Sequence, residues 1–183
     1  MPEIDTADMP APSPWVTRHA GLITAPGQIL DLAAGSGRHS RYFKALGHPI
    51  LAVDRDVTRL QDLNGQTNIE VREIDLETGT GWPFPGRQFA AIVVTNYLHR
   101  PLLAQFGEAL LPGGILLYET FALGNERFGR PSNPDFLVHS GELLEVARRA
   151  GLTVLAYEHG EVTAPRPAMI QHIAARKPLS AEG

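Results

Sequence analysis

The sequence contains no cysteine, which excludes disulfide bonds, thiolate metal ligands and a cysteine nucleophile, and we expect no metal site. It also has no apolar run close to the roughly 20 residues that a membrane-spanning helix needs. Its first residues have neither the basic nor the apolar region of a signal peptide. We therefore expect a cytoplasmic protein with no membrane segment.

Positive charge is also scarce. The formal net charge is -4 and the pI is about 6.0, so a nucleic acid is disfavoured as a partner. What the chain does have is 183 residues, 43% of them hydrophobic, which is enough to bury one core. We predict a single domain over residues 15–177, a proline-rich flexible arm over residues 1–14 and a disordered tail over residues 178–183. These patterns leave the oligomeric state open.

The most informative stretch is residues 28–43, Q-I-L-D-L-A-A-G-S-G-R-H-S-R-Y-F. It predicts a buried parallel strand, a tight turn at Gly35 and Gly37, and a helix over residues 38–46. Glycines between a strand and a helix let a ligand approach unpaired backbone N–H groups. Because Ser40 replaces the third glycine of G-x-G-x-x-G, the pattern favours a ligand other than NAD.

Acidic residues follow the next two predicted strands. Asp54 ends an apolar run over residues 50–53, one helix and one strand after the glycine turn, and Asp75 ends a third run over residues 69–74. That spacing is typical of an acid that accepts ribose hydroxyls, and carboxyl ends of parallel strands meet at one edge of a sheet. The two carboxylates are therefore expected to lie near the glycine turn.

Later segments continue the alternation of strands and helices. We predict a fourth strand over residues 89–94, a helix from Pro101 to Leu111 and a fifth strand over residues 115–120. The connection over residues 121–139 exceeds the ~12–15 residues usual for structureless loops, which favours a lid or binding loop. Ser140 then caps a helix, and residues 152–157 and 169–174 form a final strand pair.

From Ile29 to Arg176 the chain resembles the class I S-adenosylmethionine-dependent methyltransferases. D-L-A-A-G-S-G is similar to their first motif, and L-P-G-G-I-L-L-Y-E is similar to their turn into the fifth strand. The resemblance implies an α/β, Rossmann-like fold with a mostly parallel seven-stranded sheet, helices on both faces and an antiparallel last strand. Its compact size is closest to bacterial members, with a weaker similarity to the tellurite-resistance proteins.

The resemblance also implies the cofactor S-adenosylmethionine. Asp31 would act on its ammonium group through the loop or water, Asp54 would hold the ribose, and Asp75 with Leu76 would hold the adenine. The full set of predicted cofactor-binding residues is Asp31, Ala33, Gly35, Gly37, Asp54, Arg55, Asp75, Leu76, Thr95 and Asn96.

The implied reaction is methyl transfer to a small-molecule acceptor by in-line displacement, which requires alignment of acceptor, methyl and sulfur. Residues 96–99, N-Y-L-H, lack the consecutive prolines of the motif that methylates nucleobase amines. The predicted catalytic residues are Tyr97 as an orienting hydroxyl, His99 as a base and Arg127 as an anchor, with Arg130 as its alternative. His99 has the simpler alternative role of capping the next helix.

Two other functions remain open from the sequence. A non-catalytic S-adenosylmethionine-binding module would carry the same pocket motifs. An NAD-dependent Rossmann oxidoreductase is the other alternative, and both Ser40 and the terminal strand pair argue against it.

Overall fold

The computed structural model describes residues 10–79 and 81–179. Most of the predicted arm (residues 1–9) and the end of the predicted tail (residues 180–183) lie outside this range. The described residues form a seven-stranded sheet in the order β3-β2-β1-β4-β5-β7-β6. The strands are β1 (Ile29–Leu32), β2 (Ile50–Asp54), β3 (Ile69–Glu73), β4 (Phe89–Thr95), β5 (Leu110–Phe121), β6 (Thr153–Val162) and β7 (Ala168–Arg176).

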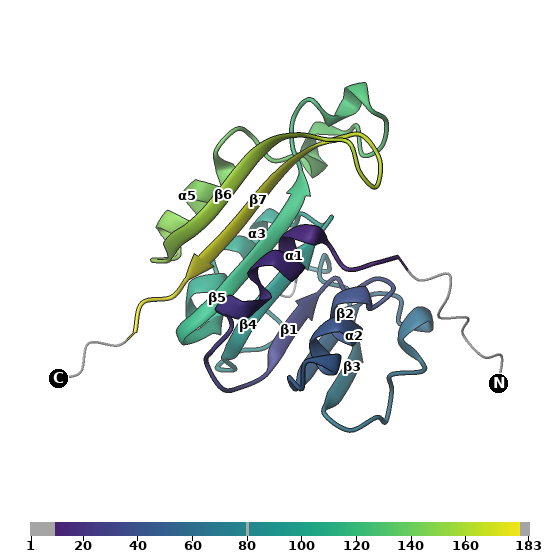
Figure 1. Ribbon diagram of the computed structural model, residues 1–183, viewed down its shortest axis with the longest axis vertical. Helices are drawn as coiled ribbons and strands as arrows, with labels where there is room; N and C mark the ends of the chain where they lie inside the picture. Colours follow the sequence, from purple (N-terminus) through teal and green to yellow (C-terminus); the bar gives the residue numbers. More distant parts are fainter. Residues whose placement is uncertain (1–9, 80, 180–183) are drawn as a thin grey trace.

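Five strands pair in parallel, and β7 runs antiparallel to both β5 and β6. Helices cover both faces of this sheet (Figure 1), with α1 (Pro14–His19) and α2 (Arg38–Ala45) on one side. The helices α3 (Arg100–Leu103), α4 (Phe106–Ala109) and α5 (Glu142–Arg149) lie on the other side. The predicted fold class is confirmed. Short 3-10 turns complete the chain at η2 (Ala20–Leu22), η3 (Thr58–Leu60), η4 (Asn125–Arg127) and η5 (Pro134–Phe136).

Side-chain alternation along the strands divides the core into two layers. In β5, Leu117 packs in the cluster that contains Trp15 and Phe43, whereas Tyr118 packs with Phe106 on the opposite face. Because side chains alternate with a period of two, Glu119 lies on the same face as Leu117, beneath α1.

The helix predicted from Pro101 to Leu111 is wrong in extent. Two short helices, α3 and α4, replace it, and Leu110 opens β5 by pairing with Phe89 of β4. Pairing with β4 provides hydrogen-bond partners for the backbone of Leu110 in the sheet, and its side chain is fully buried.

The predicted cap at Ser140 is also wrong, because Gly141 occupies the N-cap of α5 in a left-handed conformation. The Glu142 carboxylate instead accepts a hydrogen bond from the His139 backbone at 2.8 Å.

The described end of the predicted arm docks on the sheet. Ser13 caps α1 by accepting the Trp15 backbone N–H at 3.1 Å, as the Ser-Pro pattern predicts. The indole of Trp15 is buried, donates to the Ile173 carbonyl at 3.2 Å and stacks on His172 with ring centroids 4.9 Å apart. These contacts fix α1 over β5 and β7. Across the described ranges, no helix is both long and apolar enough to cross a membrane.

Candidate functional site

The glycine turn between β1 and α2 lies against the end of β2. The backbone N–H of Gly35 donates to Asp54 Oδ2 at 2.7 Å. Gly37 has φ +74°, and a Cβ there would overlap Leu60 and lie 2.6 Å from an Arg41 guanidinium nitrogen. The turn therefore needs glycine at Gly37 for both its backbone conformation and its packing.

A cavity of about 380 Å³ opens beside this turn, and we call it the strand-end cavity. It brings together seven of the predicted cofactor-binding residues, from the ends of β1, β2, β3 and β4. They are Ala33, Asp54, Arg55, Asp75, Leu76, Thr95 and Asn96, and the remaining lining residues are Ile74, Glu77, Tyr97 and Phe136.

The two aspartates of the strand-end cavity keep free acceptor capacity. Asp54 Oδ2 accepts from Gly35, and its Oδ1 accepts from the Asp56 backbone at 3.1 Å, which leaves a further lone pair on each oxygen. Asp75 accepts the Glu77 backbone N–H at 2.9 Å through Oδ1. The cavity therefore offers several acceptors to the hydroxyl and amino groups of a ligand.

Asp31 lies under the glycine turn rather than in the lining of the strand-end cavity. It is buried, and its Oδ2 accepts the Ser40 hydroxyl at 2.5 Å. Burial raises the pKa of Asp31 to about 6, against the opposing effect of the Ser40 hydrogen bond. In this structure Asp31 holds α2 against β1, and its predicted action on the cofactor remains a prediction.

The three predicted catalytic residues are dispersed. Tyr97 lines the strand-end cavity, and its buried hydroxyl makes no hydrogen bond of normal geometry. Burial, followed by the charges of Glu77 and Asp75, raises the pKa of Tyr97, so the hydroxyl stays a hydrogen-bond donor.

His99 and Arg127 line neither the strand-end cavity nor the second cavity described next. His99 occupies the N-cap of α3 but makes no side-chain cap hydrogen bond. Arg127 is exposed, pairs with Glu161 of β6 at 2.7 Å and lies over the ring of Phe128. The roles predicted for His99 and Arg127 remain predictions.

A second cavity, of about 540 Å³, lies between the arm and the sheet, and we call it the arm cavity. Residues 10–15, β5, β6, β7 and the turn between the last two strands line it. Its walls are largely apolar, with Trp15, Phe121 and Ile170 among them. Asn96, at φ +56° after β4, lines both cavities, which therefore adjoin at this residue.

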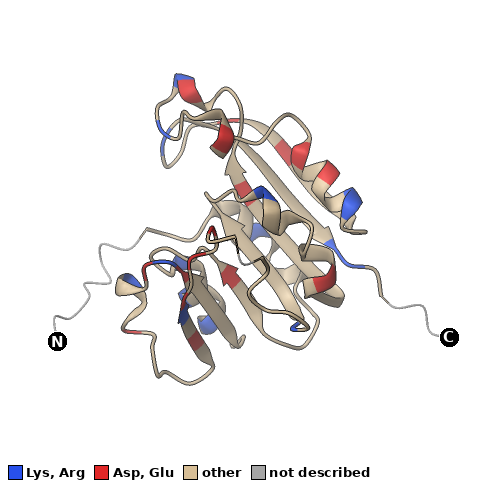
Figure 2. Ribbon diagram, turned by 180° about the vertical axis from the view of Figure 1, so that it is seen from behind, with Lys and Arg blue, Asp and Glu red and all other residues tan. Residues whose placement is uncertain are grey.

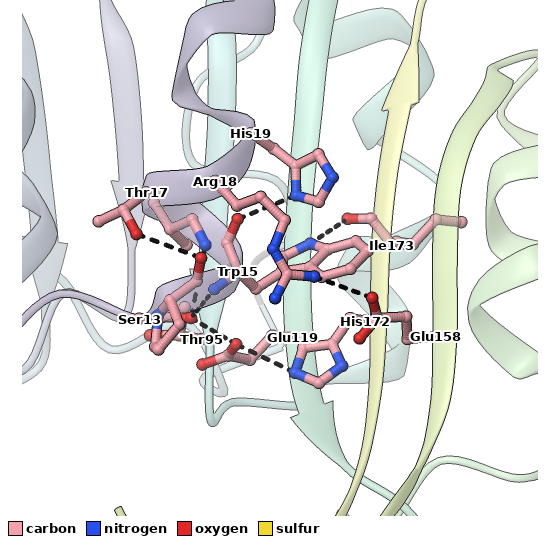
Figure 3. A network of polar contacts seen from close by, with 12 residues as sticks. Ser13, Trp15, Thr17, Arg18, His19, Thr95, Glu119, Glu158, His172 and Ile173 are labelled. Carbon is pink, nitrogen blue, oxygen red and sulfur yellow. Dashed lines mark hydrogen bonds and ion pairs between the residues drawn. The ribbon is translucent and has the colours of Figure 1, made fainter. Parts of the chain in front are cut away.

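The arm cavity contains a buried carboxylate that sequence reasoning missed. Glu119 Oε2 accepts the Ser13 hydroxyl at 2.5 Å and lies 3.4 Å from His172 Nε2 (Figure 3). The backbone of Ser13 donates to His39 Nε2 at 3.1 Å, which ties the arm to α2 as well. The available signal was a glutamate at the end of the apolar run I-L-L-Y-E, on the face that Leu117 buries.

Charged residues of both signs are distributed over the fold. Figure 2 shows acidic and basic residues interspersed along the elements, without a long segment of one sign.

Comparison with known proteins agrees with the geometry. The order of the seven strands, with one antiparallel strand near the edge, and the cavity at the strand ends define a Rossmann-like, cofactor-binding methyltransferase fold. Residues 29–114 match the family described as "Methyltransferase domain". This match covers just under half of the chain, and the structure has the fold of the class I S-adenosylmethionine-dependent methyltransferases.

Solved structures share this fold at low sequence identity. TehB from Haemophilus influenzae is 22% identical with a TM-score of 0.69, over 89% of this chain and 61% of TehB, so the chain spans less than two thirds of that protein. The 1,6-didemethyltoxoflavin-N1-methyltransferase of Burkholderia thailandensis, solved with 1,6-didemethyltoxoflavin and S-adenosylhomocysteine, is 22% identical with a TM-score of 0.67, over 90% and 76% of the two chains.

An S-adenosylmethionine-dependent methyltransferase from Mesorhizobium loti is 18% identical with a TM-score of 0.67, over 87% and 96% of the two chains. The search of curated proteins finds no match to this chain.

Proposed function

We propose that this chain transfers a methyl group from S-adenosylmethionine to a small-molecule acceptor. The observation that carries the proposal is the pair of carboxylates, Asp54 and Asp75, at neighbouring strand ends in one cavity beside the glycine turn. S-adenosylmethionine, when bound, supplies an activated methyl group on a sulfonium.

The residues of the strand-end cavity fit this cofactor. The two free lone pairs of Asp54 match the two hydroxyls of a ribose, which would each donate one hydrogen bond. The remaining acceptor of Asp75 and the apolar side chain of Leu76 suit an adenine amino group and ring. Gly35 has open space where a Cβ would stand, so the ligand can approach the turn closely.

The acceptor enters through the arm cavity in this proposal. Displacement at the methyl carbon requires the acceptor to approach opposite to the sulfur, so the two binding sites must adjoin. Asn96 is the point at which the two cavities adjoin. Tyr97 can orient a bound group by donating its hydroxyl, whereas its raised pKa argues against a role as a base.

The alternatives make different predictions. A binding module without activity would bind S-adenosylhomocysteine but turn over no acceptor. An NAD-dependent oxidoreductase would bind NAD in preference to either sulfur compound, and a diphosphate is poorly suited to a cavity with Asp54, Asp75 and Glu77 in its lining.

Calorimetry tests the cofactor specificity of the proposal, and turnover of a panel of small-molecule acceptors separates an enzyme from a binding module. S-adenosylmethionine and S-adenosylhomocysteine should bind to the purified protein, and NAD should not. Asp54→Asn should weaken S-adenosylhomocysteine at least about tenfold, since a lost charged hydrogen bond costs roughly 1.5–3 kcal/mol. Glu161→Gln, an exposed charge neutralisation outside both cavities, should leave affinity within about twofold. Tighter binding of NAD than of both sulfur compounds would reject the proposal.

A further inference from the structure

Polar side chains interrupt the apolar face that the sheet turns toward α1 and α2. Asp31, Thr95, Glu119 and His172 follow, by alternation, from buried residues of the same face in β1, β4, β5 and β7. Sheet register places Thr95 opposite Glu119, and Glu119 opposite His172. Asp31 is satisfied by Ser40, which leaves Glu119 as the buried carboxylate that faces the arm cavity.

Glu119 is held rigidly but only partly satisfied. Its Oε2 receives the Ser13 hydroxyl and lies near His172, whereas the nearest cation to its Oε1 is Arg38, at 3.9 Å. Ser13, Glu119 and His172 are all at least nine-tenths buried. A carboxylate oxygen that lines a cavity without a close hydrogen-bond donor, in largely apolar surroundings, strongly favours a ligand that brings a donor.

Two of the three arginines that line the arm cavity are exposed. Arg18 is exposed and paired with Glu158 at 2.9 Å, and Arg166 is exposed and lies over the ring of Phe121. Arg38 is partly buried, and one of its nitrogens donates to the Ala11 carbonyl at 3.3 Å. Exposed charges are screened by water more strongly than buried ones, so Arg18 and Arg166 act weakly on a deeply bound group. Arg38, 3.9 Å from Glu119 Oε1, partly offsets the charge of the buried carboxylate.

We propose that Glu119, positioned by Ser13 and His172, is the group that recognises the methyl acceptor, and that the acceptor is a small, largely apolar molecule with an N–H or O–H donor. Trp15, Phe121 and Ile170 enclose its apolar part, and Glu119 Oε1 accepts its donor. An anionic acceptor, such as a thiolate or an oxyanion, is disfavoured next to the buried carboxylate. The inference rests on the proposed function, because it takes the arm cavity as the acceptor site.

The probes that test this recognition are benzylamine, benzyl alcohol and benzoate, which share one ring and differ in charge and donor. Their binding is measured by ligand-observed NMR on the full chain saturated with S-adenosylhomocysteine. Benzylamine should bind at least about tenfold more tightly than benzoate, with benzyl alcohol between them. Equal binding, or preference for benzoate, would overturn the inference and assign recognition to Arg38 and Arg166.

Glu119→Gln should weaken the binding of benzylamine at least about tenfold. The difference in affinity between benzylamine and benzoate should therefore shrink or reverse. Glu161→Gln, which neutralises an exposed glutamate of β6 outside both cavities, should change benzylamine binding by less than about twofold. Equal losses in the two variants, or none in Glu119→Gln, would contradict a recognition role.

Retained binding of S-adenosylhomocysteine in Glu119→Gln shows that the variant is folded. The wild-type order of the three probes tests the inference even if that variant does not fold. Failure of wild-type protein to bind S-adenosylhomocysteine would reject the proposed function instead, so the two failures are distinguishable.

Discussion

The strand-end cavity and the arm cavity meet at Asn96 but are built in different ways. The strand-end cavity is lined mainly by residues that follow consecutive parallel strands, and its two aspartates are partly or fully open to water. The arm cavity is closed by residues 10–15, and its central carboxylate, Glu119, is buried. The first cavity follows from sheet topology, whereas the second depends on the docking of one short segment.

This difference separates what each cavity can control. Strand ends are fixed by the hydrogen-bonded sheet, so the strand-end cavity is suited to a cofactor that is common to a family. A docked segment can change without altering the sheet, so the arm cavity is suited to the acceptor, which differs between family members. Variants in the two regions should therefore fail in different ways.

The largest expected effect comes from undocking the arm. Trp15→Ala should lower the free energy of unfolding by about 3–5 kcal/mol, because a buried ring and its hydrogen bond to Ile173 are lost. Affinity for S-adenosylhomocysteine should stay within a few-fold of the wild-type value, since none of the described arm residues lines the strand-end cavity. Urea denaturation and calorimetry measure the two quantities.

Trp15→Phe is the control for the loss of Trp15, because it retains a ring but not the indole N–H. Trp15→Phe should lower the free energy of unfolding by about 1 kcal/mol. If Trp15→Ala abolished cofactor binding in a folded protein, the separation of the two cavities would be incorrect.

A second test uses two buried titratable groups with opposite pH dependence. Burial raises the pKa of Asp31 to about 6, so its contribution to stability is greatest below about pH 4 and declines as the pH rises to about 6. Burial, aided by Arg38, lowers the pKa of His39 to about 4, so its contribution is lost as the pH falls from about 6.5 to about 4. Each pKa shift corresponds to a change of about 3 kcal/mol in the free energy of unfolding across its pH range.

The two contributions should nearly cancel in the wild-type protein between pH 4 and about pH 6.5. Asp31→Asn should therefore make stability rise with pH over this interval, and His39→Gln should make it fall. Urea denaturation at pH 4, 5, 6 and 7 measures the slopes. Parallel slopes in the two variants would show that burial does not set these pKa values.

The smallest effect on stability and binding is expected from a substitution of Arg127, which lies outside both cavities. The same substitution tests the catalytic role predicted for Arg127. Arg127→Ala removes an exposed ion pair with Glu161 and should cost less than about 1 kcal/mol of stability. Because its side chain is outside both cavities, acceptor and cofactor constants should change by less than about twofold. A raised KM for an identified acceptor, at constant cofactor affinity, would instead support the sequence prediction.

Sequence periodicity determined the sheet and the strand-end cavity. Asp54 and Asp75 could be placed together because each follows an apolar run, and the carboxyl ends of parallel strands share one edge. The extents of short helices could not be predicted, since Leu110 is apolar and fits a helix or a strand equally well. Its pairing with Phe89 decides the outcome.

Only the tertiary structure brought Ser13, His39, Glu119 and His172 together. Glu119 and His172 meet through the antiparallel register of β5 and β7, and Ser13 reaches Glu119 from a segment that is distant in the chain. A local pattern assigns a residue to a face but does not say which residue lies opposite it, because register and docking are set by the packing of the whole core. The sequence therefore determined the fold and the strand-end cavity, and the tertiary structure decided the arm cavity and its buried carboxylate.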